Sequence, residues 1–400
     1  MLSNIENIHR ISKYRIKDRE KASIFQYICS QPSPTRKKAA ADLKIRPTTV
    51  SKSVQELIQA TLIYEGEVEN PGKQGRPEIC LHPNLDRYTT IAIYVVSLEI
   101  KGALINLGED ILAEKTITLT AGADNRVLTR EISSLIHHLD SRKPAASEIL
   151  GTGVSLPGTV NLPTRTWISS ARWPSLRNLS FKTIEERSGH KLSVYRFLDT
   201  ELEFLLIKNP DYRQGGTILF HWGYGIGSAY ANMGRVLRST LGRFGEIGHW
   251  KVDDPFPRKC TCGLTGCLET KAALWALLPE IRKTYPDTPE DENEFCDFFQ
   301  ESSLEQLPLM EKAIESIILA LTNLYKIFFP DRILIISPFT HCKSILTRLK
   351  EGLLNNIPDF ARETVSVVNL NQGFQGEIYG STYSLFHNTL RNALIARWEN

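Results

Sequence analysis

Apolar residues recur at helical spacing along the first sixty positions of the chain. Residues 20–31 place three large apolar side chains on one side of a predicted helix, because a helix brings positions three and four apart onto one face. The PSPT sequence then breaks the chain and offers Thr35 as the N-cap of a second, short helix. A third helix is predicted from Pro47, since proline suits the first helical position. Its buried stripe is Val50, Val54, Leu57 and Ile58.

The outer face of the third helix carries small polar or basic side chains. Such side chains reach base edges and phosphates when a helix enters the major groove of DNA. Two helices joined by a short turn, the second with an exposed polar start, form the layout of a helix-turn-helix domain. A three-helix packing module without a DNA role is the alternative. The predicted DNA contacts are Lys37, Lys38, Thr48, Thr49, Ser51, Lys52 and Gln55.

Residues 62–83 have the pattern of a β-hairpin, which would form the wing of that domain. Within it, Arg76 lies between a glycine and a proline, in a slender extended segment that could enter a narrow minor groove. An interdomain turn is the alternative, and a linker that becomes ordered on DNA would serve both roles. Arg76 is therefore a further predicted DNA contact.

Past residue 88 the pattern changes to short apolar runs that alternate with helical segments. The runs are rich in β-branched residues, TTIAIYVVSLEI and RILIISPF among them, and the helical segments include residues 125–140 and 309–328. Strands with intervening helices indicate α/β layering. For the roughly 300 residues of this region we expect two α/β lobes with a ligand cleft between them.

Composition and charge add a partner and a compartment to this picture. The chain has 400 residues and a formal net charge of +3, and its first 80 residues hold 14 Lys and Arg against 9 Asp and Glu. A basic N-terminal segment favours a polyanionic partner. No apolar run approaches the ~20 residues that span a bilayer, and the N-terminus has no signal-peptide pattern. Together with seven unevenly spread cysteines, this predicts a cytoplasmic protein without disulfides or a membrane partner.

Three of the seven cysteines lie within eight residues of one another. The KCTCGLTGC sequence contains Cys260, Cys262 and Cys267, and His249 precedes the first of them by eleven positions. Three thiolates and an imidazole nitrogen form the closed tetrahedral donor set of a structural zinc site. We therefore expect one structural Zn²⁺ per chain, with no open position for a catalytic water. A cluster of reduced buried thiols or a redox switch is the alternative.

Three segments in fixed order carry a resemblance to a known family. They are GVSLPGTV (153–160), GYGIGSAYANMGRVLRSTLGRFGEIGHWKV (223–252) and CTCGLTGCLE (260–269). They resemble the signature segments of the ROK family, which groups sugar kinases with sugar-responsive repressors, and the resemblance covers nearly the whole chain. It implies zinc at the four positions named above. It also implies an α/β fold in which an N-terminal winged helix-turn-helix precedes a two-lobed, actin-like and ribonuclease H-like sugar-kinase body.

The expected domain boundaries follow from this resemblance. Residues 1–82 would form the DNA-binding domain with its linker, and residues 83–200 a first α/β lobe completed by a C-terminal helix at 382–400. Residues 201–381 would form a second lobe that holds the zinc loop and a dimerisation surface. Family members with an N-terminal DNA-binding domain are repressors, including regulators of xylose, glucose and N-acetylglucosamine metabolism.

Sugar contacts are expected close to the zinc loop. Carboxylates held beside a metal-braced loop suit bidentate recognition of sugar hydroxyls, and the family uses the matching residues in that way; helix caps or surface salt bridges are the alternative. Asp199 matches the aspartate base of the family, although Leu198 replaces the asparagine that precedes it and hydrogen-bonds sugar hydroxyls. The expected sugar contacts are Pro157, Gly158, Asp199, Glu246, His249 and Glu269.

The nucleotide side departs from the kinases of the family. Kinases open their first strand with Asp-x-Gly-(Gly/Ala)-Thr, whereas this chain has YVVSLEIKGAL, with Leu98 and Glu99 where small residues are expected. A carboxylate repels a triphosphate, and side chains block its approach to the backbone. Ser337 and Pro338 likewise replace two glycines near the adenosine.

We therefore expect a sequence-specific repressor of carbohydrate-metabolism genes rather than an enzyme. It would act as a homo-oligomer, a dimer or a tetramer, on operator DNA with two half-sites. A sugar or phosphosugar bound between the lobes would control it. The alternatives are an ATP-dependent sugar kinase with a fused DNA-binding domain, and a repressor controlled by a protein partner without sugar binding.

Overall fold

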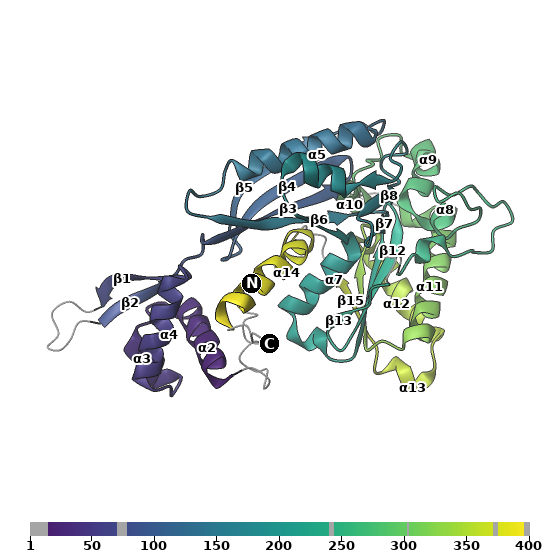
Figure 1. Ribbon diagram of the computed structural model, residues 1–400. Helices are drawn as coiled ribbons and strands as arrows, with labels where there is room; N and C mark the ends of the chain where they lie inside the picture. Colours follow the sequence, from purple (N-terminus) through teal and green to yellow (C-terminus); the bar gives the residue numbers. More distant parts are fainter. Residues whose placement is uncertain (1–14, 70–77, 240–243, 302–303, 371–374, 396–400) are drawn as a thin grey trace.

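Residues 15–69, 78–239, 244–301, 304–370 and 375–395 are described by the structure, a computed structural model. An N-terminal domain projects from a larger two-lobed body, and the C-terminal helix lies where the two meet (Figure 1). The α/β class and the two-lobed arrangement predicted from the sequence are confirmed.

The N-terminal domain consists of three helices and a two-stranded antiparallel hairpin. Its elements are α2 (Ile16–Ser30), α3 (Arg36–Asp42), α4 (Pro47–Gln59), β1 (Ile63–Glu69) and β2 (Glu78–Pro83). The hydroxyl of Thr35 accepts a hydrogen bond from the backbone N–H of Lys38 at 3.2 Å, so the predicted cap is confirmed. The predicted apolar stripes are buried against one another, with Ile58 partly buried at their edge. Arg76 lies outside the described residues.

The first lobe is a five-stranded sheet in the order β10-β6-β3-β4-β5. Its strands are β3 (Tyr88–Val96), β4 (Glu99–Asn106), β5 (Ile111–Thr118), β6 (Glu148–Leu156) and β10 (Leu192–Arg196). The first three pair antiparallel, and β6 pairs parallel with both of its neighbours. The apolar run at 89–100 is therefore two strands, joined by a turn at Ser97, where φ is +53°.

Helices cover both faces of this sheet (Figure 1). One face packs against α5 (Asn125–Asp140), next to α6 (Phe181–Ser188), and the other against α14 (Gln375–Leu394). A small sheet of β7 (Thr159–Asn161), β8 (Thr166–Ser169) and β9 (Leu179–Ser180) lies between β6 and α6 in sequence. The C-terminal helix begins earlier than the predicted residue 382, because Ile378 and Tyr379 already pack on the lobe.

The second lobe repeats the plan with a five-stranded sheet in the order β13-β12-β11-β14-β15. Its strands are β11 (Gly216–Trp222), β12 (Ile226–Asn232), β13 (Arg235–Val236), β14 (Arg332–Ile336) and β15 (Ser366–Leu370). One face packs against α7 (Phe197–Lys208). The remaining helices are α8 (Glu269–Ala272), α9 (Leu274–Thr284), α10 (Glu292–Glu301), α11 (Pro308–Phe328), α12 (Lys343–Asn355) and α13 (Asp359–Arg362).

Two features of the body bear on function. Helix α14 contacts α7 as well as the first-lobe sheet, so it joins both lobes. Its last turns then enter the core of the N-terminal domain, where Phe386, Leu390 and Leu394 are buried with the apolar side chains of α2 and α4. None of the described helices combines the length and the apolar character needed to cross a membrane.

Candidate functional site

A cavity of about 420 Å³ is lined by residues of both lobes. That volume lies in the range of small-molecule sites. Five of the six predicted sugar contacts line it: Pro157, Gly158, Glu246, His249 and Glu269.

Gly158 lies on the cavity wall in a backbone conformation that only glycine adopts without strain. Its φ is +78°, and a Cβ atom there would lie 2.4 Å from the carbonyl oxygen of Ser169. The preceding carbonyl, of Pro157, accepts a hydrogen bond from the indole N–H of Trp167 at 2.8 Å. The loop is thereby fixed with its backbone against the cavity.

Asp199, the sixth predicted contact, does not line the cavity. It lies in the first turn of α7, is only 2% exposed, and has Oδ1 3.9 Å from the guanidinium of Arg196. Burial raises the pKa of this carboxyl, against the opposing charge of Arg196. Leu198, the preceding residue of α7, lines the cavity instead. The carboxylate of Asp199 is buried away from it.

Glu269 is anchored to the second lobe. It is the first residue of the four-residue helix α8, and Oε1 accepts a hydrogen bond from the backbone N–H of Ile226 at 3.0 Å. The indole N–H of Trp275 lies 3.4 Å from Oε2. Both carboxylate oxygens are thus held in one orientation on the wall of the cavity.

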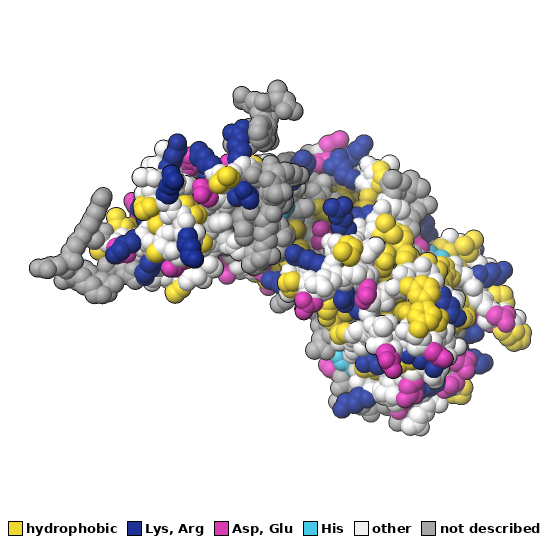
Figure 2. Space-filling view, turned by 90° about the horizontal axis from the view of Figure 1, so that it is seen from below, with side chains coloured by type: hydrophobic (Ala, Val, Ile, Leu, Met, Phe, Trp, Pro, Cys, Tyr) yellow, Lys and Arg dark blue, Asp and Glu magenta, His cyan; other side chains and the backbone are white. Residues whose placement is uncertain are grey.

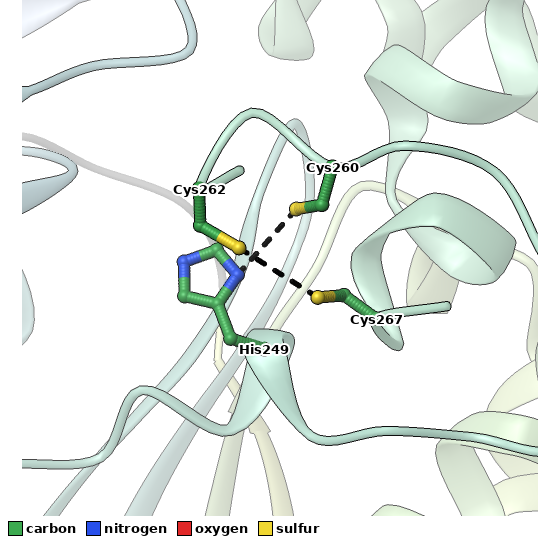
Figure 3. Close-up of side chains that lie close together, drawn as sticks. All are labelled: His249, Cys260, Cys262 and Cys267. Atoms are coloured by element: carbon green, nitrogen blue, oxygen red, sulfur yellow. Dashed lines mark hydrogen bonds between the residues drawn. The ribbon is translucent and has the colours of Figure 1, made fainter. Parts of the chain in front are cut away.

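The predicted metal ligands converge on one point (Figure 3). One ligand atom from each of His249, Cys260, Cys262 and Cys267 lies within 4.8 Å of all the others. The Nδ1 atom of His249 is 3.6 Å from Sγ of Cys260, and the Sγ atoms of Cys262 and Cys267 are 3.7 Å apart. Zinc bond lengths place tetrahedral nitrogen and sulfur ligands ~3.6–3.8 Å apart. The donor set and its spacing therefore fit a metal of this type.

The two ring nitrogens of His249 face different groups, one in the metal cluster and one at the cavity. Nδ1 faces Cys260, whereas Nε2 lies 3.9 Å from the carboxylate of Glu246. The same carboxylate lies 3.9 Å from the guanidinium of Arg196. A metal on Nδ1 would leave Nε2 directed at this carboxylate, an arrangement that fixes the ring and its tautomer.

Three further glutamates line the cavity and were missed by sequence reasoning: Glu201, Glu292 and Glu377. Burial raises the pKa of Glu201 to about 7. Burial together with the charges of Glu201 and Glu292 raises the pKa of Glu377 well above its usual range. Glu292 differs, because His221 and Arg172 outweigh its burial and bring its pKa to about 2. The three come from α7, α10 and α14, so no sequence spacing links them.

The predicted DNA contacts on α3 and α4 are exposed or half-buried. Thr48, Ser51, Lys52 and Gln55 are exposed on α4, and Thr49 is half-buried. Lys37 is exposed but paired with Glu78 at 2.8 Å, and the ammonium of Lys38 donates to the carbonyl of Ser33 at 3.0 Å. Lys and Arg side chains are spread over this domain in the view from below (Figure 2, left).

Comparison with known proteins gives consistent matches. The profile described as the ROK family matches residues 90–382. The DNA-binding transcriptional repressor Mlc of Escherichia coli K12 is 23% identical over 242 residues, which is 59% of this chain and 58% of Mlc. A putative xylose repressor of Caldicellulosiruptor sp. Rt8B.4 is 26% identical over 80% of this chain and 83% of its own length. This chain thus aligns with less than two thirds of Mlc.

Solved structures share the fold with this chain. A ROK family transcriptional regulator, homologous to the E. coli Mlc protein, superposes with a TM-score of 0.69 at 20% identity and covers 95% of this chain and 98% of its own. A ROK hexokinase from Thermus thermophilus superposes with a TM-score of 0.59 at 18% identity, over 76% of this chain and 99% of its own. This chain therefore shares its fold with a regulator and a kinase, and the kinase match leaves about a quarter of this chain uncovered.

Proposed function

This chain belongs to the ROK family, and from that premise we propose that it is a DNA-binding transcriptional repressor of carbohydrate-metabolism genes. A sugar bound in the cavity between the lobes would set its affinity for operator DNA. The observation that carries the proposal is helix α14, which lines the cavity at Glu377 and ends in the core of the N-terminal domain. The repressor names of its relatives support the same conclusion.

DNA contact is assigned to the exposed face of α4. Lys52 would contact phosphate, and Thr48, Ser51 and Gln55 would meet base edges, since the start of this helix is exposed and polar. Paired domains on a homodimer would bind two half-sites of an operator. The protein would act in the cytoplasm.

Zinc is assigned to the Cys3His cluster. Four protein ligands close the coordination shell, so the metal would brace the loop at 260–267 rather than take part in chemistry. Because Thr261 and Cys262 also line the cavity, a braced loop would hold the sugar-facing groups Glu246, His249 and Glu269 in place.

Phosphoryl transfer is disfavoured by charge. Two of the three arginines that line the cavity, Arg172 and Arg196, already face Glu292 and Glu246, and a nucleoside triphosphate needs cationic or backbone N–H groups around its phosphates. At the β3–β4 turn, the hydroxyl of Ser97 donates to Asp291, which puts a further carboxylate beside the turn that the resemblance to the family's kinases would assign to phosphate binding.

A gel-shift experiment on the DNA upstream of its own gene tests the proposal. The purified protein should shift this DNA specifically, and at least one sugar in a panel of neutral sugars, amino sugars and phosphosugars should change the shift. A protein that fails to shift this DNA and transfers phosphate from ATP to a sugar, in a reaction abolished by Asp199→Asn, would instead be a kinase.

A further inference from the structure

Two carboxylates in the cavity wall have unpaired oxygens. Glu201 is 7% exposed and Glu377 is 3% exposed, and Oε2 of each has no hydrogen-bond partner among the described residues. A buried carboxylate without a partner is costly, and such groups are normally paired or neutralised. Both side chains line the same cavity, while the unpaired Oε2 atoms themselves are shielded behind its wall, so a cation in the cavity would act on the two carboxylates through their negative charge.

The other carboxylates of the cavity already have partners. Glu292 lies 3.5 Å from Arg172 and from His221, and it accepts from the backbone N–H of Tyr224. Glu246 is near Arg196 and His249, and Glu269 accepts from two N–H groups as described above. The unmet demand for positive charge therefore lies at Glu201 and Glu377 alone among the described cavity glutamates.

Glu201 and Glu377 are brought together by the packing of α7 against α14. The carboxylate of Glu201 lies so close to Gly376 that a Cβ atom there would be 1.8 Å from Oε2. Only glycine leaves room for this carboxylate beside the first turn of α14. The glycine therefore lets the Glu201 carboxylate pack against the first turn of α14, the turn that also contains Glu377.

We propose that the cavity takes an amino sugar whose protonated amine is bound by Glu201 and Glu377. An ammonium group has three donors and one positive charge, which would offset the negative charge that these two carboxylates leave uncompensated on the cavity wall. The hydroxyls of the ring would be held by the groups near the zinc loop. This inference rests on the proposed function, because it names the class of effector that the same cavity binds.

The titration of the two carboxyls agrees with this assignment. Burial brings the pKa of Glu201 to about 7 and holds that of Glu377 well above its usual range. The charged groups that act on Glu377 are Glu201, Glu292 and Lys101. A bound ammonium group would favour the ionised carboxylates.

Calorimetric titration of the full-length protein with D-glucosamine and with D-glucose tests the proposal, because the two sugars differ only in an amine and a hydroxyl. We expect glucosamine to bind about 10- to 100-fold more tightly, the range of a charge-assisted hydrogen bond. Glu201→Gln and Glu377→Gln should each remove this preference, because each should weaken glucosamine binding more than glucose binding. Glu203→Gln, on the same helix but outside the cavity lining, should retain it.

Several results would overturn the proposal. The first three are equal binding of the two sugars, no binding of any amino sugar, and a preference that survives in both cavity variants. The fourth is that Mg²⁺ or Mn²⁺ binds at the two glutamates and changes the gel shift in place of a sugar. The gel shift separates this proposal from the proposed function. DNA release by a neutral sugar or phosphosugar alone would retain the repressor and reject the amine. A preference for the amine without any effect on DNA binding would retain the amine site and reject the repressor.

Discussion

Replacing Glu201 by glutamine should stabilise the protein, and more so at higher pH. The pKa of this carboxyl rises from 4.5 in the unfolded chain to about 7 in the buried site. One pKa unit corresponds to about 1.4 kcal/mol, so the ionised group costs the folded state about 3 kcal/mol once it is fully charged. Because the folded pKa is the higher one, this cost is absent below the unfolded pKa and complete above the folded pKa.

Urea unfolding of the wild type and Glu201→Gln at about pH 5 and about pH 8 measures this difference. We expect a gain below about 1 kcal/mol at the lower pH and about 3 kcal/mol at the higher pH. Glu377 is electrostatically coupled to Glu201, so the double variant should gain less than the sum of the single variants. Glu203→Gln, which loses a partly exposed ion pair with Arg238, should change the free energy of unfolding little at either pH. A gain in the free energy of unfolding that does not depend on pH, or a loss at about pH 8, would refute the conclusion that Glu201 is a buried, unpaired carboxylate.

Three further predictions concern the metal, the DNA and the C-terminal helix. Purified protein should contain one zinc per chain by elemental analysis, and the Cys262→Ser variant should lose it. Cys262 is exposed, so its replacement leaves the core intact. A metal content equal to that of the wild type would therefore contradict the assigned ligand set. Lys52→Ala should weaken binding to every DNA sequence and lower the slope of log affinity against log salt by about 0.9, and an unchanged slope would remove Lys52 from the phosphate contacts. Leu390→Ala should destabilise the N-terminal domain by about 2–5 kcal/mol and impair operator binding, with sugar affinity in calorimetry unaltered; equal loss of both would show that the body has been damaged too.

Local sequence signals predicted the N-terminal domain well. Val50, Val54 and Leu57 lie three or four residues apart, so a single helix buries all three regardless of what else the chain does. The cap at Thr35 depends on one hydroxyl and a backbone N–H three residues later. The Cys3His cluster could be predicted equally well. Three of its ligands lie in one loop, and the chemistry of thiolates and imidazole limits which metals they bind.

The acidic end of the cavity could not be predicted in this way. Glu201, Glu292 and Glu377 lie in helices far apart in the chain, and each looks like an ordinary solvated helix residue in its own segment. Their burial follows only from the packing of α7, α10 and α14 around one cavity. Asp199 shows the converse: its motif pointed to the cavity, but the turn of α7 directs Leu198 there instead.

The arrangement of α14 gives the proposed control a physical basis. Its 20 residues extend about 30 Å at the rise of an α-helix, from Glu377 at the cavity to Leu394 in the core of the N-terminal domain. Both ends are buried, so a displacement of the first turn is transmitted to the last instead of being absorbed by a loop. A ligand changes the DNA-competent population only by its difference in affinity for the two states, and an ammonium group that pairs with Glu377 acts on the helix itself. A coupling of about 1–3 kcal/mol would then change operator affinity roughly 5- to 150-fold, and one ion pair in a buried site is of sufficient strength to supply it.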